Sequence, residues 1–214
     1  MVVQRHPLNE RTPHGPDPDQ AAITACRNGD VNAFENLVEK YQKQMFNTAY
    51  RMIGSYDDAV EVVQDAFVAA FKNINKFEQA AKFTTWLTRI VRNMSINRSK
   101  QLAAAKHKKT VSLDDYLQND HGKAKHHPAA DHPTALQQLE REQIQQQVQW
   151  CIDGIEIGFR EVLVLKDIQD FSYAEIGETL KIPQGTVKSK LYRARDFLKT
   201  CLKKAFGDLS HVLS

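Results

Sequence analysis

The segment from Ser172 to Arg195 constrains the fold of this 214-residue chain more than any other. Ser172 and Glu175 have the spacing of a capping box, in which the two residues satisfy free backbone amides at the start of a helix. Pro183 can begin a second helix, because the N–H that proline lacks would have no partner in a first turn. The segment therefore predicts two short helices joined by a tight turn.

Both predicted helices have one apolar side, with residues that recur at helical spacing and are expected to face the core. These residues are Ala174, Ile176, Gly177 and Leu180 in the first helix, and Val187, Leu191, Ala194 and Leu198 in the second. The open face of the second helix is polar and cationic and carries Thr186, Lys188, Ser189, Lys190, Tyr192, Arg193 and Arg195. Charge alone would fit an ordinary solvated helix. This segment also has a capping box, a turn, a proline at a helix start and an apolar stripe, all at the spacing that two packed helices need. Together these features indicate a helix-turn-helix that enters the major groove of DNA.

The turn between these helices departs from the usual pattern. Lys181 stands where such motifs often have glycine, because the backbone there can need a positive φ angle. A non-glycine residue in that conformation costs about 1 kcal/mol. Lys181 therefore makes the match to a helix-turn-helix slightly weaker, and the prediction of that motif stands.

Charge is distributed unevenly, although the net charge is only +3. Residues 82–109 contain eight Lys and Arg and no acidic residue, and residues 181–204 contain eight against Asp196 alone. Two separate basic blocks predict two contact zones on a polyanion, which indicates nucleic acid. Residues 56–65 carry four acidic residues and no cation, so we expect that surface to bind protein rather than DNA.

Helical periodicity predicts an all-α fold of two small helical domains joined by a flexible linker. Helices are expected near residues 19–28, 30–52, 57–74 and 84–105, and again at 134–151 and 158–166 before the helix-turn-helix. The linker is rich in His and poor in large apolar residues, a composition that cannot bury enough surface to fold. The predicted division is a disordered tail at 1–17, a first domain at 18–106, a linker at 107–133, a second domain at 134–206 and a tail at 207–214.

Other site types find little support in the sequence. The linker histidines suggest a metal site, but such a site needs a rigid frame, so we expect no metal; they are His121, His126, His127 and His132. Cys26, Cys151 and Cys201 form no CxxC pair, so reduced structural thiols are expected, with a redox switch as the alternative.

Targeting and catalytic signals are also missing from the sequence. No apolar run approaches the roughly 20 residues of a membrane span, and no signal-peptide core precedes the first helix, so a cytoplasmic protein without membrane insertion is expected. No catalytic constellation or glycine-rich phosphate loop occurs either. We therefore expect the protein not to be an enzyme and to bind no cofactor.

The first basic block combines cations with aromatic residues. Its expected buried stripe consists of Phe83, Leu87, Ile90, Val91 and Met94. The residues expected to contact DNA are Lys82, Trp86, Arg89, Arg92, Asn93, Asn97 and Arg98, since Arg and Lys suit phosphates and Asn can bond base edges. The polar loop at 77–82 lies beside aromatic residues and could capture an unstacked base. For Trp86 and Phe83, packing in the core is the competing interpretation.

Three segments together resemble one family. Residues 57–71 are similar to a D-A-E-D-x-x-Q-E-x-F helix, residues 83–93 to an F-x-x-W-L-x-R-I-A-x-N segment, and residues 159–195 to a helix-turn-helix domain. In this order they resemble bacterial RNA polymerase sigma factors of the extracytoplasmic-function group of the sigma-70 family. Val60-Glu61 and the loop sequence Glu78-Gln-Ala-Ala depart from the common pattern, so the promoter preference is not carried over.

The resemblance implies a role for each part. The first domain would be region 2, which docks on the β′ coiled-coil of core polymerase through Asp57, Asp58, Glu61, Gln64, Asp65 and Phe67. The basic segment after it would read the promoter −10 element, with Asn93 and the loop at 77–82 holding a flipped base. The second domain would be region 4, which reads the −35 element. Implied partners are core polymerase (β′ coiled-coil and β flap), promoter DNA and a cognate anti-sigma factor.

Two other function classes compete with this interpretation. A one-component helix-turn-helix regulator would bind operator DNA without being a polymerase subunit, but it needs a ligand pocket or receiver where this chain has a basic domain. A protein-interaction adaptor with incidental basic helices fits poorly with the absence of acidic residues across 82–109.

Overall fold

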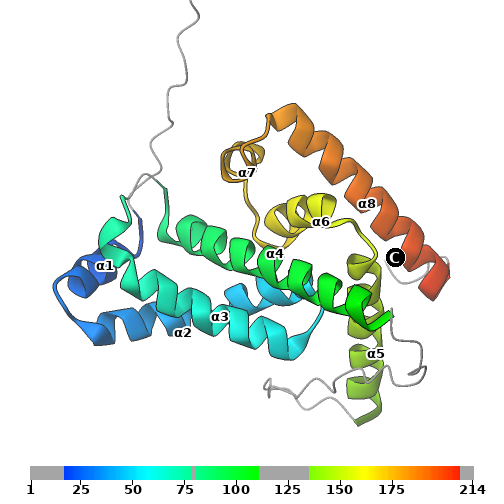
Figure 1. Cartoon of the computed structure of the whole chain (residues 1–214), viewed down its shortest axis with the longest axis horizontal. Coiled ribbons are helices and arrows are strands. Elements are labelled where there is room, and N and C mark those ends of the chain that lie inside the picture. Colours follow the sequence, from blue (N-terminus) through cyan, green and yellow to red (C-terminus); the bar gives the residue numbers. More distant parts are fainter. Residues whose placement is uncertain (1–16, 79–80, 111–134, 208–214) are drawn as a thin grey trace, which may run out of the picture.

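The computed structural model describes residues 17–78, 81–110 and 135–207. Within these ranges every regular element is helical and there is no strand, which confirms the predicted all-α class. The helices form two groups, each with its own apolar core. Figure 1 shows the first group in blue to green and the second in yellow to red.

The first group contains four α-helices and a short 3₁₀ turn: α1 (Gln20–Arg27), α2 (Val31–Ile53), α3 (Tyr56–Lys72), η1 (Ile74–Lys76) and α4 (Phe83–Thr110). Asp30 caps α2 by accepting hydrogen bonds from the backbone amides of Asn32 and Ala33. Gly54 ends α2 with a φ of 83°, a conformation that glycine adopts without steric cost. Ser55 then caps α3, so the chain turns sharply between two long helices.

The apolar stripes of α2, α3 and α4 form the core of this group, including the stripe predicted on α4. Leu37, Met45, Phe83 and Leu87 are among its largest fully buried side chains. Asp17 lies at the edge of the tail predicted from the sequence, yet its carboxylate accepts a hydrogen bond from the Phe83 amide at 2.6 Å. It thus satisfies a free amide at the start of α4, which runs five residues beyond its expected end at 105.

The second group contains α5 (Ala135–Asp153), α6 (Ile157–Leu163), a π-helical turn η2 (Val164–Ile168), α7 (Tyr173–Leu180) and α8 (Gln184–Phe206). The predicted capping box is present: the Glu175 amide donates to Ser172 Oγ at 3.2 Å, and the Ser172 amide donates to Glu175 Oε2 at 2.8 Å. Lys181 ends α7 with a φ of 55°, the strained conformation expected there. A Cβ on Gly177 would lie 2.9 Å from the Ile182 carbonyl oxygen, so glycine lets α7 pack closely on the turn.

The apolar stripe of α8 lies where the sequence places it: Val187, Leu191 and Ala194 are buried, and Leu198 packs against the same core. The assignment of Ala174 to the packing side of α7 is wrong, because that residue is exposed. Ala174 lies two positions before the buried Ile176, which is about 200° around the helix, so it faces away from the core.

The expected reduced state of the cysteines is also corrected. Cys151 of α5 and Cys201 of α8 form a disulfide with a Cα–Cα distance of 5.7 Å. They are 50 residues apart in sequence and meet only because the two helices pack together. Cys26 is a free thiol in the first core, where burial raises its pKa.

The described helices include none that is both long and apolar enough to cross a membrane. The same residues hold no group of three or more His, Cys, Asp or Glu side chains arranged for a metal ion. The linker histidines, at which no metal is expected, lie outside the described residues.

Candidate nucleic-acid interface

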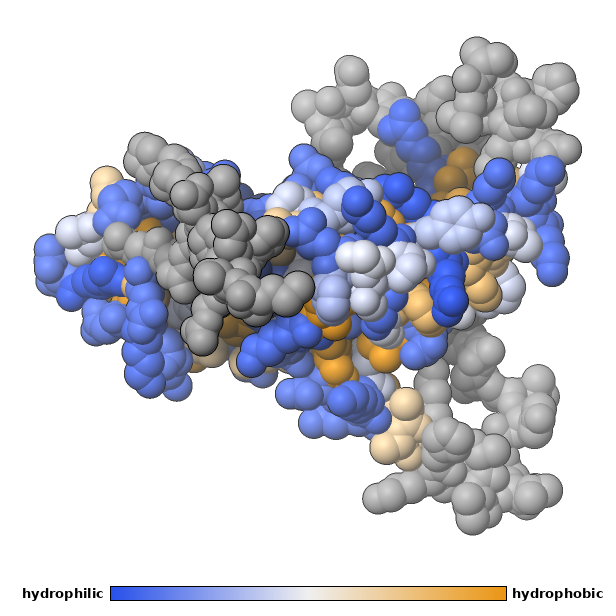
Figure 2. Space-filling model, turned by 90° about the horizontal axis from the view of Figure 1, so that it is seen from above, coloured by the Kyte–Doolittle hydropathy of each residue, from blue (hydrophilic) through white to orange (hydrophobic). Residues whose placement is uncertain are grey.

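The open face of α8 presents several of the residues predicted to read duplex DNA. Lys188, Ser189 and Arg193 are exposed, and Tyr192 is the most exposed of them at 73%. In Figure 2, most of the described residues at the surface are hydrophilic, with apolar residues showing between them. A helix held by its apolar stripe with polar side chains outward matches the docking geometry of a recognition helix.

Three other residues of the predicted set on α8 are less available. Lys190 turns inward, where its ammonium donates to the Gly158 carbonyl at 3.1 Å. Thr186 is half-buried, and Arg195 is exposed but forms an ion pair with Asp167, which raises its pKa by hydrogen bonding. Among the exposed residues, the Lys188 ammonium lies 5.7 Å from the centroid of the Tyr173 ring, and Ser189 Oγ donates to the Thr186 carbonyl at 3.0 Å. The structure therefore separates the predicted set into side chains that stay exposed and side chains that turn inward or form an ion pair.

On α4 most of the predicted cations are already bound. Arg92 donates from Nε to Glu161 Oε2 at 3.0 Å and pairs with the same oxygen through Nη2. Arg89 Nε donates to Thr179 Oγ1 at 3.3 Å. Both partners belong to the second group of helices. Exposed members of the predicted set are Lys82, Asn93 and Asn97.

Arg98 is occupied by the acidic helix of its own domain. It bonds to Asp58 and also reaches Glu61 at 3.0 Å, and hydrogen bonding to Asp58 raises its pKa. Residues from the two predicted surfaces also line one shallow hollow of about 190 Å³ between α3 and α4: Glu61, Asp65, Asn97 and Arg98. The predicted docking and DNA-binding residues are thus adjacent.

Trp86 packs against the first core. Its ring lies 5.2 Å from that of Phe77 and 5.8 Å from that of Phe83, measured between centroids, and its side chain is half-buried. Arg27 holds the start of the neighbouring loop by donating to the carbonyls of Ile74 and Phe77. Residues 79–80 lie outside the described part of the chain, so the base-capture pocket stays a prediction.

Most of the residues predicted to dock on polymerase lie at the surface of α3, and the docking itself stays a prediction. Asp57, Glu61, Gln64 and Asp65 are exposed, and Asp58 is partly covered by Arg98. Phe67 was assigned to docking but is buried in the core, with its ring centroid 6.4 Å from that of Phe34 in an edge-on arrangement. Its position on the inner stripe of α3 explains the burial.

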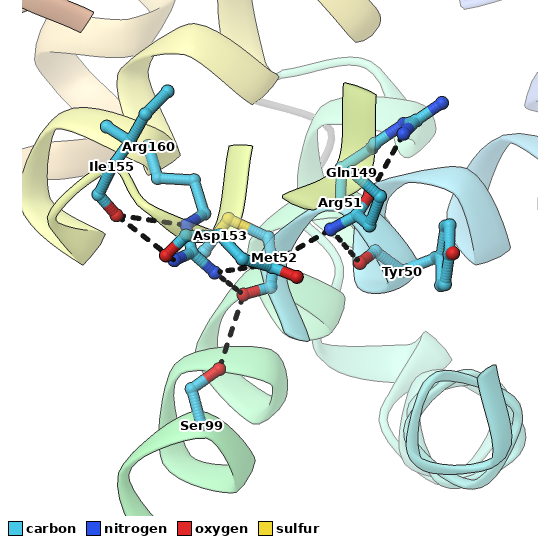
Figure 3. Close-up of polar contacts among 8 residues, drawn as sticks. All are labelled: Tyr50, Arg51, Met52, Ser99, Gln149, Asp153, Ile155 and Arg160. Atoms are coloured by element: carbon cyan, nitrogen blue, oxygen red, sulfur yellow. Dashed lines mark hydrogen bonds and ion pairs between the residues drawn. The ribbon is translucent and has the colours of Figure 1, made fainter. Parts of the chain in front are cut away.

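The two groups of helices meet in a polar contact around the C-terminal end of α2 (Figure 3). Arg160 of α6 donates to the Met52 carbonyl at 2.9 Å and to the Ile155 carbonyl at 3.0 Å. Burial lowers the pKa of this guanidinium. Gln149 of α5 donates to the Tyr50 carbonyl at 3.3 Å and accepts from Arg51 at 2.9 Å.

Sequence reasoning missed this contact. Gln149, Arg160 and Glu161 were not candidates, and Arg92 was a candidate only for DNA, because these residues find partners in the other group of helices more than 60 positions away. One signal was present: Glu161 stands directly before the apolar run Val162-Leu-Val-Leu165. A carboxylate at a core-facing position needs a charged or hydrogen-bonding partner, which here is Arg92.

Comparison with known families supports the resemblance found in the sequence. Residues 37–104 match the family model described as sigma-70 region 2, and residues 146–198 match the one described as sigma-70, region 4. The first match covers most of α2, α3 and most of α4, and the second covers the helix-turn-helix.

Relatives match along most of the chain. The ECF RNA polymerase sigma factor SigW of Bacillus subtilis is 33% identical over 182 residues, covering 85% of this chain and 95% of that protein. The ECF RNA polymerase sigma-E factor of Escherichia coli K12 is 30% identical, covering 83% and 91%.

Solved structures show the same fold. CnrH in complex with the cytosolic domain of CnrY matches with a TM-score of 0.61 and 22% identity, covering 88% of this chain and 99% of that one. RpoE of Bartonella quintana, in complex with the anti-sigma factor NepR, matches with a TM-score of 0.59 and 22% identity, covering 81% and 98%. Both regions, their order and the length of the sequence matches place this chain in the extracytoplasmic-function group of the sigma-70 family of RNA polymerase sigma factors.

Proposed function

We propose that this sigma factor binds core RNA polymerase and directs promoter-specific initiation by reading two promoter elements. The observation that carries the proposal is the exposed polar face of α8, backed by a buried stripe, in a domain separate from the basic helix α4. Two DNA-reading surfaces in one chain suit a factor that contacts a promoter at two places. A one-component regulator would have no use for the region 2 domain that this chain carries.

Within this proposal each surface has one task. Residues 18–106 form region 2, and the exposed carboxylates of α3 dock on the β′ coiled-coil of polymerase. The exposed Asn93 and Asn97, with Arg89 and Arg92, contact the −10 element, and the loop at 77–82 receives a flipped base. Residues 134–206 form region 4, where Lys188, Ser189, Tyr192 and Arg193 read the −35 element in the major groove. Residues 107–133 connect the two regions.

The remaining assignments follow from the same role. The chain supplies recognition and polymerase supplies catalysis, so no catalytic residue or cofactor is assigned to it. Its place of action is the cytoplasm, where polymerase works. RpoE of Bartonella quintana was solved with an anti-sigma factor, and we assign a cognate anti-sigma factor to this chain as well.

Run-off transcription with purified core polymerase tests the proposal. The template is a genomic fragment recovered by immunoprecipitation of the sigma factor from cells. Transcripts that start at one position only when the chain is added support the proposal. Binding to the same fragment without polymerase, and no effect on initiation, would instead support an operator-binding regulator.

A further inference from the structure

The disulfide between Cys151 and Cys201 is buried on one side and reachable on the other. Cys151 of α5 is fully buried, whereas Cys201 of α8 is partly exposed. Cys201 also lines a hollow of about 410 Å³ between α5 and α8, whose walls include Trp150 and Phe197. A thiol reagent in solution therefore has a route to the bond, through Cys201, that requires neither helix to unfold.

The lining of this hollow suits the approach of a thiolate. Lys204 follows Cys201 by three positions on α8, which places both residues on one side of the helix, and both line the hollow. The other residues that line it are uncharged. The Lys204 ammonium attracts an incoming thiolate, and it favours the thiolate form of Cys201 once the bond is broken.

Helix α5 is held to region 4 by contacts other than the apolar core. That core includes no described residue of α5. Instead, Arg160 of α6 pairs with Asp153 at 3.2 Å, at the C-terminal end of α5, and the disulfide joins Cys151 to α8. Just after α5, a Cβ on Gly154 would lie 3.1 Å from the Phe197 ring, so glycine lets this wall of the hollow come close. The disulfide thus links α5 directly to the C-terminal half of α8.

The residues proposed to read the −35 element lie on the other half of α8. Val187 and Leu191 hold that half in the apolar core of region 4. Arg193 precedes Cys201 by eight positions, which is about 12 Å along the helix. Breaking the disulfide therefore leaves the packing of the DNA-reading half in place.

From these observations we infer that Cys151 and Cys201 form a thiol–disulfide switch. The oxidised pair clamps α5 onto α8 and shapes the hollow around Trp150 and Phe197, whereas the reduced pair releases α5 while the DNA-reading half of α8 stays folded. Disulfides in cytoplasmic proteins are mostly transient or redox-sensing, because thiol systems there keep cysteines reduced. In this one respect the inference rests on the proposed function, since it takes the chain to work beside polymerase in the cytoplasm.

Both directions of the switch balance with reactants of a stated class. In reduction, a thiolate of a thioredoxin-class dithiol attacks the Cys201 sulfur, and the electron pair of the broken S–S bond leaves on Cys151, which takes up a proton. The second thiol of the dithiol then displaces Cys201, so the reductant gives two electrons and ends as a disulfide. In oxidation, the Cys201 thiolate attacks hydrogen peroxide and becomes a sulfenic acid with loss of hydroxide. The Cys151 thiolate then displaces a second hydroxide and restores the bond.

The kinetics of reduction test the switch in the full chain, with Cys26→Ala so that only the pair contributes thiols. Alkylation with a maleimide after timed exposure to dithiothreitol, followed by mass measurement, counts the thiols released. Direct attack at Cys201 predicts a rate that rises about tenfold when the dithiothreitol concentration rises tenfold, in this variant and in wild type alike. A rate independent of concentration would mean that the bond reacts only after unfolding, and would overturn the switch.

Lys204→Glu and Lys199→Glu form a matched pair of charge reversals on α8. Lys199 is exposed and precedes Cys201 by two positions, about 200° around the helix, so it lies on the other side. Lys204→Glu is expected to slow reduction by about threefold at low salt and by less at high salt, because ions screen exposed charges. Equal rates for the two variants at low salt would refute the hollow as the route of attack.

Hydrogen exchange reports what the switch moves. Reduction is expected to speed amide exchange more in α5 and in residues 199–206 than in residues 184–195 of α8. Equal acceleration along the whole of α8 would overturn the clamp and leave a crosslink that only stabilises region 4.

Equilibration with thioredoxin tests whether the switch operates under the proposed conditions. Equal amounts of reduced and oxidised thioredoxin should leave both forms of the chain present. A chain that stays fully oxidised under excess reduced thioredoxin would overturn the inference. None of these measurements needs DNA or polymerase, so a failure of the switch is distinguishable from a failure of the proposed function.

Discussion

Helices α4 and α8 are similarly rich in cations, but they differ in how many of those cations are bound by acidic side chains. Each lies in a stretch with eight Lys and Arg and at most one acidic residue. On α8, Lys188 and Arg193 remain exposed. On α4, Arg92 and Arg98 are bound by carboxylates from other helices. The two helices thus have equal charge density along the chain, but the cations of α8 stay exposed while most of those of α4 are bound by other side chains.

The difference has a structural cause. Helix α8 packs against α5, α6 and α7 through its apolar stripe, and Lys188 and Arg193 on its outer face stay exposed. Helix α4 lies between α3 and region 4, and acidic residues approach it from both sides. The comparison shows that the cations of a basic helix stay available or become paired according to whether packing brings acidic side chains to them.

The largest expected difference between the regions is in stability, because the disulfide ties α5 to α8 within region 4. For a loop of 50 residues, removing the link is expected to lower the free energy of unfolding by about 4 kcal/mol in the chain-entropy description. Cys201→Ser should speed amide hydrogen exchange in α5 and α8 and leave α2 unchanged. A reducing agent should reproduce the effect in wild type and add nothing in the variant. Equal acceleration in α2 would contradict this separation.

The next effect concerns DNA recognition by the exposed face of α8. Lys188→Ala and Arg193→Ala are each expected to weaken −35 binding by about 1–3 kcal/mol if the side chain contacts a base. Holoenzyme binding to promoter fragments, with core polymerase affinity measured in parallel, checks the result. Lys199→Ala on the same helix is the control, since it removes an exposed cation beyond the predicted reading face. An equal loss of polymerase affinity would refute the assignment of this face to DNA.

A smaller effect is expected on the acidic surface of α3. Asp65→Lys reverses one exposed charge and should weaken binding to core polymerase by about 1 kcal/mol, chiefly through slower association. Glu39→Lys, an exposed reversal on α2, is the matched control. Stopped-flow association at two salt concentrations measures the effect. Identical rates for the two variants would place polymerase docking elsewhere.

The smallest expected effect is at the turn of the helix-turn-helix. Lys181→Gly removes the penalty of a φ of 55° and should raise the free energy of unfolding of region 4 by up to about 1 kcal/mol. Lys199→Gly, inside α8, should change stability in the opposite direction by a similar amount, because glycine disfavours a helix interior. Chemical denaturation distinguishes the two. A loss of stability in both variants would mean that Lys181 contributes more than its backbone conformation.

Much of the fold followed from local patterns. The capping box at Ser172 and the strained Lys181 were expected from neighbouring residues alone, and the structure has both. Phe67 and Lys190 show where this reasoning failed. Phe67 lies on the inner stripe of α3 and packs against Phe34, whereas Lys190 lies at the edge of the open face of α8 and turns toward the Gly158 carbonyl.

The sequence by itself determined the helices, their caps, their apolar faces and the two basic blocks, because those depend on residues within a few positions of one another. Only the tertiary structure decided which charges are free. Arg92 meets Glu161, and Cys151 meets Cys201, across long stretches of chain, and these pairs exist because particular helices pack together. Electrostatic and covalent partners depend on distances of a few ångströms, which local periodicity does not specify.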